Sequence, residues 1–311
     1  MTKEVRVASS MQMKYVIEAI EKMSGEAGLN AQSDNAKLDV IAIREMLERS
    51  HAHQKTAPGT TYADADICPV HMEVVFPEKL ETDNIIFYMH GGSFISGSAK
   101  HSRGFASVLA AEVGCRVFTI DYRLAPEHPF PAGVDDCFTA YQALLMEYPG
   151  TKISLIGDSA GAMAALVTTL RAMRAGIQLP SSVIIHSPGA TLVDIGRENY
   201  DTHDLLVGKN IASVLKGVLY DESIDLENPD LSPLYGDYRG FPPVFMTSDA
   251  NETFSIDAQL LYDKLTEAGV EITWVSVEGA FHAFGTVGRG TPESAQLLDE
   301  AEAFIKKHFA S

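Results

Sequence analysis

From about residue 70 onward, short hydrophobic runs alternate with longer segments of helical periodicity. The runs are rich in β-branched and aromatic residues, and several are almost continuously apolar, as strands covered on both faces are. They read MEVVFPE, NIIFYMH, RVFTIDY, ISLIG, SVIIHS, PPVFMTS and ITWVSVEG. Between them, segments such as GAMAALVTTLRAMRAG place apolar residues three and four positions apart. The alternation predicts an α/β fold with a mostly parallel, doubly wound central sheet.

Two regions depart from this alternation. Residues 1 to about 60 contain two stretches with helical periodicity and no expected strand, and residues 191–235 insert helical and loop sequence between two strands. We expect both regions to cover one end of the sheet. The predicted organisation is an N-terminal helical cap at 1–60 and a main domain at 61–311, with 191–235 contributing an insertion to the cap.

Charge and cysteine content narrow the classes of function. The chain has 24 Lys and Arg against 42 Asp and Glu, a formal net charge of -18, which repels nucleic-acid phosphates and anionic lipid heads. The N-terminus carries charges throughout and has no uninterrupted apolar stretch, so we expect a cytoplasmic protein without a membrane span. Cys68, Cys115 and Cys137 are far apart and predict buried thiols instead of disulfides or a zinc site.

The sequence GDSAG at 157–161 lies between a predicted strand and a predicted helix. Gly157 and Gly161 remove the side chains that would clash in a sharp strand-to-helix turn, as in a nucleophile elbow. Such a turn presents Ser159 at the carboxyl edge of the sheet, where ligands bind in open α/β folds. The amide of Ala160, at the start of the helix, can donate to a developing oxyanion. Ser159 is therefore the candidate nucleophile.

A second glycine-rich turn, HGGSF at 90–94, follows the predicted strand NIIFYMH. The amides of Gly91 and Gly92 have no side chain to shield them, so they can approach a carbonyl oxygen as oxyanion donors.

A serine nucleophile needs a base, and the base needs an acid to orient it. His282, in GAFHAFG, follows the last predicted strand on a glycine-flanked loop. The segment MTSDANETFSID before it offers Asp249, Glu252 and Asp257 as the acid. The order serine, acid, histidine matches that of α/β-hydrolases.

The succession HGGSF, DYRLAPEHPFPA at 121–132, GDSAG, DLSPLYGDYRGFPPVFMTSD and GAFHAFG resembles the bacterial hormone-sensitive-lipase-like carboxylesterases, an α/β-hydrolase group, over roughly residues 70–310. The resemblance implies an α/β-hydrolase fold with a helical cap, a Ser-acid-His triad and no metal or organic cofactor. The family's register places the acid at Glu252, two residues before Phe254, although most members have Asp there; Asp249 remains the alternative. Ser93 stands where the family often has a third glycine.

The function expected from these residues is that of a serine carboxylesterase acting on neutral short- to medium-chain esters through an acyl-enzyme intermediate. The alternatives are a lactonase or an amidase or formamidase with the same triad, and a non-catalytic ligand receptor on the same fold. The expected partner is a small-molecule ester, and a homodimer is left open.

We also expect Asp158 to brace the elbow, and Asp121, Arg123 and Glu127 to form a buried ion-pair network.

Overall fold

The computed structural model of the chain describes residues 1–26, 39–51 and 55–311, with the side chains of 23–26, 50 and 51 left aside. Its centre is a nine-stranded sheet. The strands are β1 Thr2–Val7, β2 Thr61–Asp64, β3 Met72–Phe76, β4 Ile85–Met89, β5 Arg116–Ile120, β6 Ile153–Asp158, β7 Ser182–His186, β8 Val244–Asp249 and β9 Ile272–Glu278. Their order in the sheet is β1-β9-β8-β7-β6-β4-β5-β3-β2. β2 and β3 pair antiparallel, as do β3 and β5, and the other pairings are parallel.

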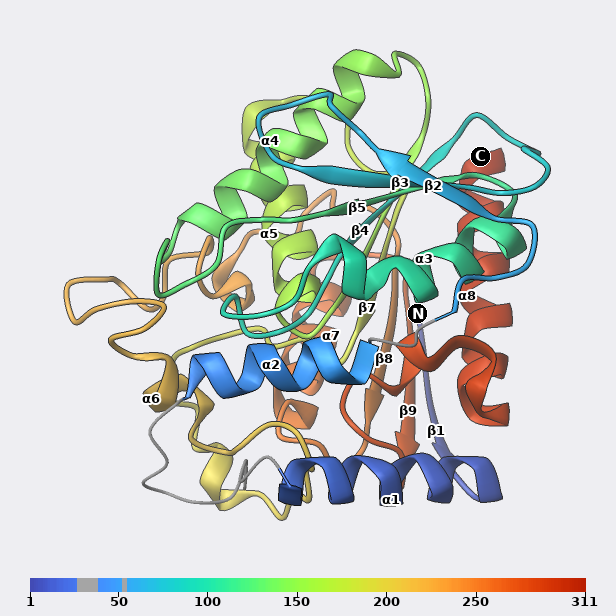
Figure 1. Cartoon of the computed structure of the whole chain (residues 1–311). Coiled ribbons are helices and arrows are strands. Elements are labelled where there is room, and N and C mark those ends of the chain that lie inside the picture. Colours follow the sequence, from blue (N-terminus) through green and yellow to red (C-terminus); the bar gives the residue numbers. More distant parts are fainter. Residues whose placement is uncertain (27–38, 52–54) are drawn as a thin grey trace.

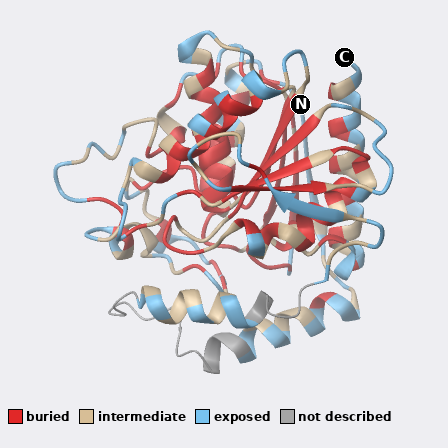
Figure 2. Ribbon diagram, turned by 45° about the horizontal axis from the view of Figure 1, so that its top comes forward, coloured by how far each residue is buried: buried red, intermediate tan, exposed pale blue. Residues whose placement is uncertain are grey.

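The seven hydrophobic runs all form strands of this sheet, as predicted. Every residue of β4, β7 and β8 is buried, because helices cover both faces of the centre of the sheet. Figure 2 shows this buried centre in red. The predicted α/β class with a mostly parallel sheet is confirmed.

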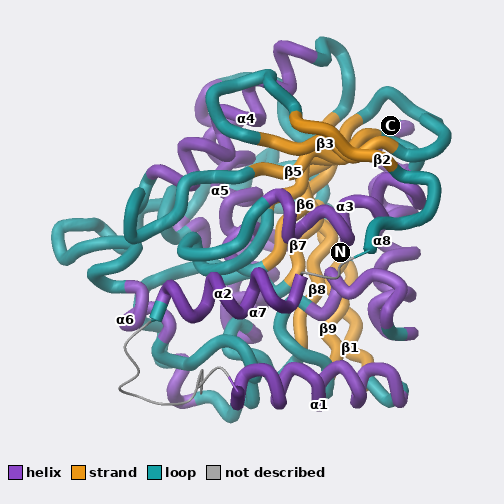
Figure 3. The backbone as a smooth tube through the Cα atoms, in the orientation of Figure 1, coloured by secondary structure: helices purple, strands orange, loops and turns teal. Residues whose placement is uncertain are grey.

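The helices lie in two layers, one on each face of the sheet (Figures 1 and 3). α4 (Ala132–Glu147), α5 (Ala160–Ala175) and α7 (Ser255–Glu267) contribute to one hydrophobic cluster, and α3 (Ala99–Val113) and α8 (Pro292–Ala310) contribute to the other. Local signals set the ends of these helices. Ser98 accepts the His101 N–H at the start of α3, and Gly114 ends that helix in a left-handed conformation.

The expectation of a segment without strands before residue 60 is wrong at its start. Residues Thr2–Val7 form β1, which pairs in parallel with β9 along its whole length. β1 is an edge strand with mostly exposed side chains, so backbone hydrogen bonds hold it and little apolar surface is buried. Periodicity gives almost no signal for such a strand. β2, also exposed along its length, was missed for the same reason.

The two predicted N-terminal helices are present as α1 (Met11–Glu26) and α2 (Val40–His51). Residues 35–38, where the second helical stretch was expected to begin, lie outside the described residues. Figure 1 shows α1 and α2 on the side of the molecule where β8 and β9 end. The 191–235 insertion is mostly loop, with the short helix α6 (Ile211–Leu215). Among the described residues, no helix has the length and apolarity to span a bilayer.

A buried ion pair attaches the insertion to α7. The guanidinium of Arg197 contacts both carboxylate oxygens of Asp257 at 2.7 and 2.9 Å, and the exposed fractions of the two side chains are 3% and 0%. The carboxylate also accepts the N–H groups of Ala190 and Thr191, and Arg197 donates to the Thr191 carbonyl. A buried ion pair needs such additional hydrogen bonds to offset desolvation. Asp257, one of the three candidate acids, is therefore a structural residue.

The substitution Arg197→Met is expected to destabilise the protein by about 3 kcal/mol, because it leaves the Asp257 carboxylate buried without its cation. Urea unfolding followed by circular dichroism measures the effect. Arg239→Met is the matched control, since Arg239 pairs with Asp237 on the surface, and its unfolding midpoint should stay at the wild-type value. Equal midpoints for the two variants would contradict the role given to the buried pair.

Candidate active site

Ser159 lies at the turn between β6 and α5, with backbone angles φ 53° and ψ −118°. A positive φ is strained for a residue with a side chain, so the surrounding packing must enforce it. Gly161 provides that packing, because a Cβ there would overlap the Met89 carbonyl oxygen at the end of β4. The Ser159 N–H donates to the His186 carbonyl at 2.8 Å, and its side chain makes no capping hydrogen bond to α5. The hydroxyl is thus left available at the helix N-terminus, as the elbow prediction requires.

The HGGSF loop follows β4, the neighbour of β6 in the sheet. Gly92 has φ 112°, which favours glycine, and its carbonyl accepts the N–H groups of Ile95 and Ser96, so the loop closes tightly. Ser93 and Phe94 also have positive φ values, 56° and 58°. Ser93 therefore takes a left-handed conformation at the position where the family often has glycine.

The amides of this loop differ in what they contact. Gly91 packs against the Asp158 carboxylate, and its N–H donates a hydrogen bond that favours the ionised form of Asp158. In the part of the chain that the structure describes, the N–H groups of Gly92, Ser93 and Ala160 have no acceptor. The sequence predicted Gly91, Gly92 and Ala160 as oxyanion donors, and the free amide of Ser93, the residue after Gly92 in the motif, is a further candidate that was not predicted.

Asp158 connects the elbow to the neighbouring strand, as predicted. It accepts the Tyr88 hydroxyl of β4 at 2.5 Å, in addition to the Gly91 amide. Burial raises the pKa of Asp158, and the hydrogen bond from Tyr88 and the proximity of His282 oppose that shift. The carboxylate holds the turns after β4 and β6 against each other.

His282 and Glu252 form a buried hydrogen-bonded pair on the loops after β9 and β8. Nδ1 of His282 lies 2.7 Å from Oε2 of Glu252, and the two side chains are 6% and 0% exposed. Phe254 packs edge-on against the imidazole with ring centroids 5.5 Å apart, and Ser187 Oγ accepts the N–H of Ala283. Nε2 of His282 is buried and has no hydrogen-bond partner among the described residues. The ring is fixed at Nδ1 and available at Nε2.

Burial and charge act on both members of this pair. Burial raises the pKa of Glu252, and the hydrogen bond from His282 opposes the shift. Burial disfavours the protonated form of His282, but its hydrogen bond to Glu252 and the charges of Glu252, Asp204 and Asp158 outweigh that effect and raise its pKa. The pair therefore holds its proton more tightly than an isolated histidine does.

Asp249, the alternative acid, is the last residue of β8 and is buried. Burial raises its pKa to about 6, and the nearby backbone N–H groups of Asn251, Ala280 and Ala250 oppose that shift. No hydrogen bond joins Asp249 to His282 in the described structure. Of the three candidate acids, Glu252 is the one that contacts the imidazole.

The expected ion-pair network of Asp121, Arg123 and Glu127 is wrong in its partners. Arg123 pairs with Asp136 on α4. Asp121 accepts the Ala99 N–H at the start of α3 and contacts His71, and Glu127 pairs with Arg44 on α2. The chain is extended or turning here, so these side chains point to different neighbours and brace separate elements. Arg44 also donates to the carbonyls of Ile95 and Ala125, which ties α2 to the HGGSF loop.

Asp204, from the insertion, lies beside the pair. A carboxylate oxygen of Asp204, a carboxylate oxygen of Glu252 and a ring nitrogen of His282 lie within 4.8 Å of one another, and all three residues are buried. The Asp204 oxygens already accept backbone N–H groups, and Glu252 and His282 bond to each other. We interpret the cluster as part of a proton-transfer site and not as a set of metal ligands.

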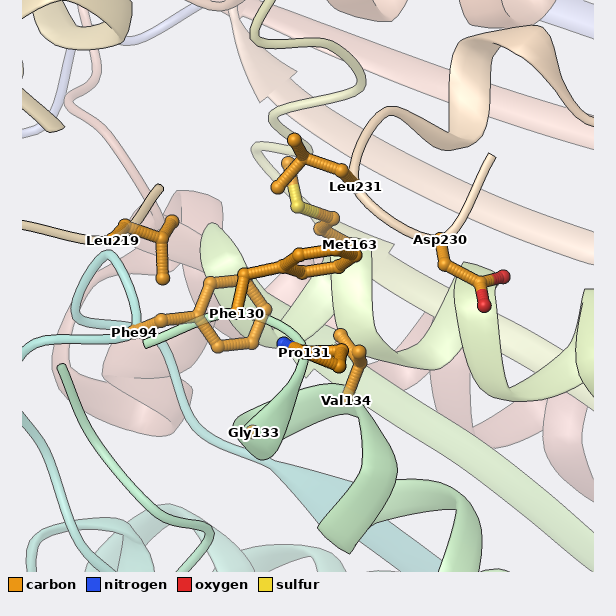
Figure 4. Close-up of a pocket in the computed structure, with 9 residues that line it drawn as sticks. All are labelled: Phe94, Phe130, Pro131, Gly133, Val134, Met163, Leu219, Asp230 and Leu231. Atoms are coloured by element: carbon orange, nitrogen blue, oxygen red, sulfur yellow. The ribbon is translucent and has the colours of Figure 1, made fainter. Parts of the chain in front are cut away.

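A small apolar pocket begins within one helical turn of Ser159. Met163, whose N–H donates to the Ser159 carbonyl, contributes to its wall, as does Phe94 of the HGGSF loop. The empty space is about 230 Å³, part of it open to solvent. Figure 4 shows its lining residues, which are Phe94, Phe130, Pro131, Gly133, Val134, Met163, Leu219, Asp230 and Leu231.

Comparisons with known proteins agree with this geometry. A family model described as the alpha/beta hydrolase fold matches residues 86–286. An esterase of Acinetobacter venetianus is 31% identical over 247 residues, covering 76% of this chain and 81% of that protein. An acetyl-hydrolase of Streptomyces hygroscopicus is 33% identical over 224 residues, covering 71% of this chain and 75% of the relative.

The crystal structure of an esterase from the bacterial hormone-sensitive lipase family superposes with a TM-score of 0.86 at 27% identity, covering 97% of this chain and all of that one. The sheet order, the strained serine at the elbow and these matches agree with one another. The chain belongs to the α/β-hydrolase family and, within it, to the bacterial hormone-sensitive-lipase-like carboxylesterases.

Proposed function

We propose that the protein hydrolyses neutral carboxylic esters with short acyl chains through an acyl-enzyme on Ser159. The observation that carries the proposal is the Glu252–His282 hydrogen bond of 2.7 Å, with the buried Nε2 left without a partner. A neutral imidazole held by a carboxylate at Nδ1 is a general base at Nε2. Glu252 thus takes the role in which most of the family uses Asp. Its longer side chain starts after β8, three residues beyond Asp249.

The proposed reaction has two halves. Ser159 Oγ attacks the ester carbonyl carbon while Nε2 of His282 takes the hydroxyl proton, and the amides of Gly92, Ser93 and Ala160 bind the oxyanion. The alcohol leaves with the proton from His282, and the acyl group stays on Ser159. Water then attacks the acyl-enzyme, giving its proton to His282. Collapse of the second tetrahedral intermediate releases the acid and returns the proton to Ser159.

Pocket size and charge support the substrate class. The pocket is small, and most of its lining side chains are apolar, which suits a short acyl chain. Its wall is apolar apart from Asp230, whose carboxylate is already paired with Arg171 and Arg174, so it gives no partner to an anionic acyl group. The net charge of -18 disfavours the approach of anionic esters. One relative is named an acetyl-hydrolase, which agrees with a short acyl group.

We also propose that α1, α2 and residues 191–235 form the cap over the site, and that β1 belongs to the catalytic domain together with the rest of residues 61–311. Arg44 on α2 donates to the carbonyl of Ile95, the residue that follows the HGGSF loop. Met13 on α1 is buried in the hydrophobic cluster that also contains Phe281, the neighbour of His282. These positions support a cap that is packed on the catalytic domain.

Ser159→Ala should lower kcat for p-nitrophenyl butyrate by at least about 10⁴-fold, and Glu252→Gln by about 10³-fold or more. Asp249→Asn should keep kcat within about tenfold of the wild type, because Asp249 does not contact the imidazole. A fluorophosphonate probe followed by mass spectrometry should label Ser159. An inactive Asp249→Asn with an active Glu252→Gln would reverse the assignment, and full activity of Ser159→Ala would refute the mechanism.

The rate should fall at acid pH with a midpoint above 6.5, the ordinary pKa of histidine. The sign follows from the raised pKa of His282: the imidazole stays protonated up to a higher pH, and the protonated form cannot act as the base. The pH dependence of kcat/KM with p-nitrophenyl butyrate measures this midpoint. A midpoint at or below 6.5 would contradict the electrostatic account.

Leu219→Trp should reduce kcat/KM for p-nitrophenyl hexanoate about tenfold relative to the acetate, because the indole fills the pocket, whereas Leu219→Ala should favour the longer ester. Leu80→Ala, on an exposed leucine, is the control. An acetate-to-decanoate series measures the preference, and an unchanged preference in both Leu219 variants would exclude this pocket as the acyl site.

Lactones and anilides assayed in parallel test the lactonase and amidase alternatives.

A further inference from the structure

Asp204 is a buried carboxylate that the proposed mechanism does not use. It lies in the 191–235 insertion and is 6% exposed. One of its carboxylate oxygens is within 4.8 Å of a carboxylate oxygen of Glu252 and of a ring nitrogen of His282. Burying another carboxylate beside the triad acid is electrostatically unfavourable unless hydrogen bonds support it. Its contacts show how it is supported.

Three backbone N–H groups donate to Asp204. Those of Leu206 and Val207 reach Oδ1 at 2.9 Å, which turns the insertion loop back on itself. The N–H of Thr253 reaches Oδ2, also at 2.9 Å. Because Thr253 follows Glu252 directly, one carboxylate oxygen holds its own loop and the other holds the loop of the acid.

Two further hydrogen bonds join the same loops on either side of Glu252. The His203 N–H donates to the Asn251 carbonyl at 2.8 Å, and the Thr253 hydroxyl donates to the Val207 carbonyl at 2.6 Å. Thr253 is 1% exposed, so its bonds to Val207 and Asp204 are shielded from water. The residues before and after Glu252 are thus both fixed to the insertion.

The charges around the pair are mainly negative. Asp204 and Asp158 both favour the protonated form of His282, and Asp204 disfavours ionisation of Glu252. Asp158 on β6 and Asp204 in the insertion are the further charged groups that act on the pair. Arg197 lies over the Phe254 ring, which packs on His282, but its charge is engaged by Asp257. Asp249 on β8 and His186 on β7 are buried at the ends of neighbouring strands. Burial lowers the pKa of His186 to about 4, so it stays neutral in an esterase assay.

We propose that Asp204 is a positioning residue for ester hydrolysis, whose carboxylate fixes the Glu252 loop to the insertion and places a further negative charge beside the Glu252–His282 pair. This inference rests on the proposed triad. It assigns to the insertion a role in proton transfer in addition to covering the site. The role has two separable parts, a clamp made by hydrogen bonds and a charge.

The charge is tested with Asp204→Asn, which keeps the size of the side chain and removes its charge; the amide nitrogen also replaces one accepting oxygen, so the effect of the charge is read from the pH midpoint and not from kcat. The acid-side midpoint of kcat/KM should move down by about one pH unit, because the protonated imidazole loses a nearby anion. Asp225→Asn is the matched control: it removes the same charge from the same insertion, and Asp225 likewise accepts a backbone N–H, from Glu227, but on the surface. Its midpoint should equal that of the wild type. Equal midpoints for Asp204→Asn and wild type would overturn the role of the charge.

The clamp is tested with Thr253→Val, which removes the bond to Val207 at constant charge. We expect kcat to fall about tenfold with an unchanged midpoint, whereas unchanged kcat would overturn the clamp. If Asp204→Asn does not fold, Asp204→Glu replaces it. Retaining the charge, it should keep the wild-type midpoint while kcat falls, and a midpoint moved towards acid would refute the charge. If the wild-type protein shows no esterase activity, or if the fluorophosphonate probe does not label Ser159, the proposed function itself is rejected.

Discussion

The close approach of α5 to the sheet is the constraint on which the site depends. Gly157 and Gly161 leave no room for a side chain at the elbow, and Gly161 lies directly against the Met89 carbonyl. This contact brings the first turn of α5 to the ends of β4 and β6, and it holds Ser159 at a positive φ. The same proximity places the HGGSF loop beside the helix N-terminus, where unpaired amides and the helix dipole both favour a developing negative charge.

The second constraint is electrostatic. The proposed base is surrounded by carboxylates, and its pKa is raised because Glu252, Asp204 and Asp158 together outweigh the effect of burial. A site of this kind stabilises the imidazolium that forms when His282 takes the serine proton, at the expense of the fraction of neutral base available at low pH. Stabilising the imidazolium reduces the fraction of neutral imidazole at a given pH. The charges that assist proton transfer therefore also restrict the pH range of activity.

Much of this was accessible from the sequence, for physical reasons that can be named. Buried strands need apolar runs, so the hydrophobic pattern predicted β3 to β9; β1 carries its side chains in solvent and has no such pattern. The register of the family motif selected Glu252 over Asp249, and the structure places Glu252 against His282. The partners of Arg123 and Glu127, and the position of Asp204, depend on how distant segments pack, which no local pattern encodes.

The insertion links substrate binding to proton transfer. Leu219 and Leu231 from this segment line the apolar pocket, Arg197 attaches it to α7, and Asp204 holds the acid loop. A change in the insertion that reshapes the pocket therefore also acts on the carboxylate nearest the triad. The ion pair and the hydrogen bonds to Thr253 are buried, so they fix the start of the segment against α7 and the acid loop. Acyl-chain preference and pH response are for this reason expected to vary together in this protein, although the residues that govern them lie on different stretches of the same segment.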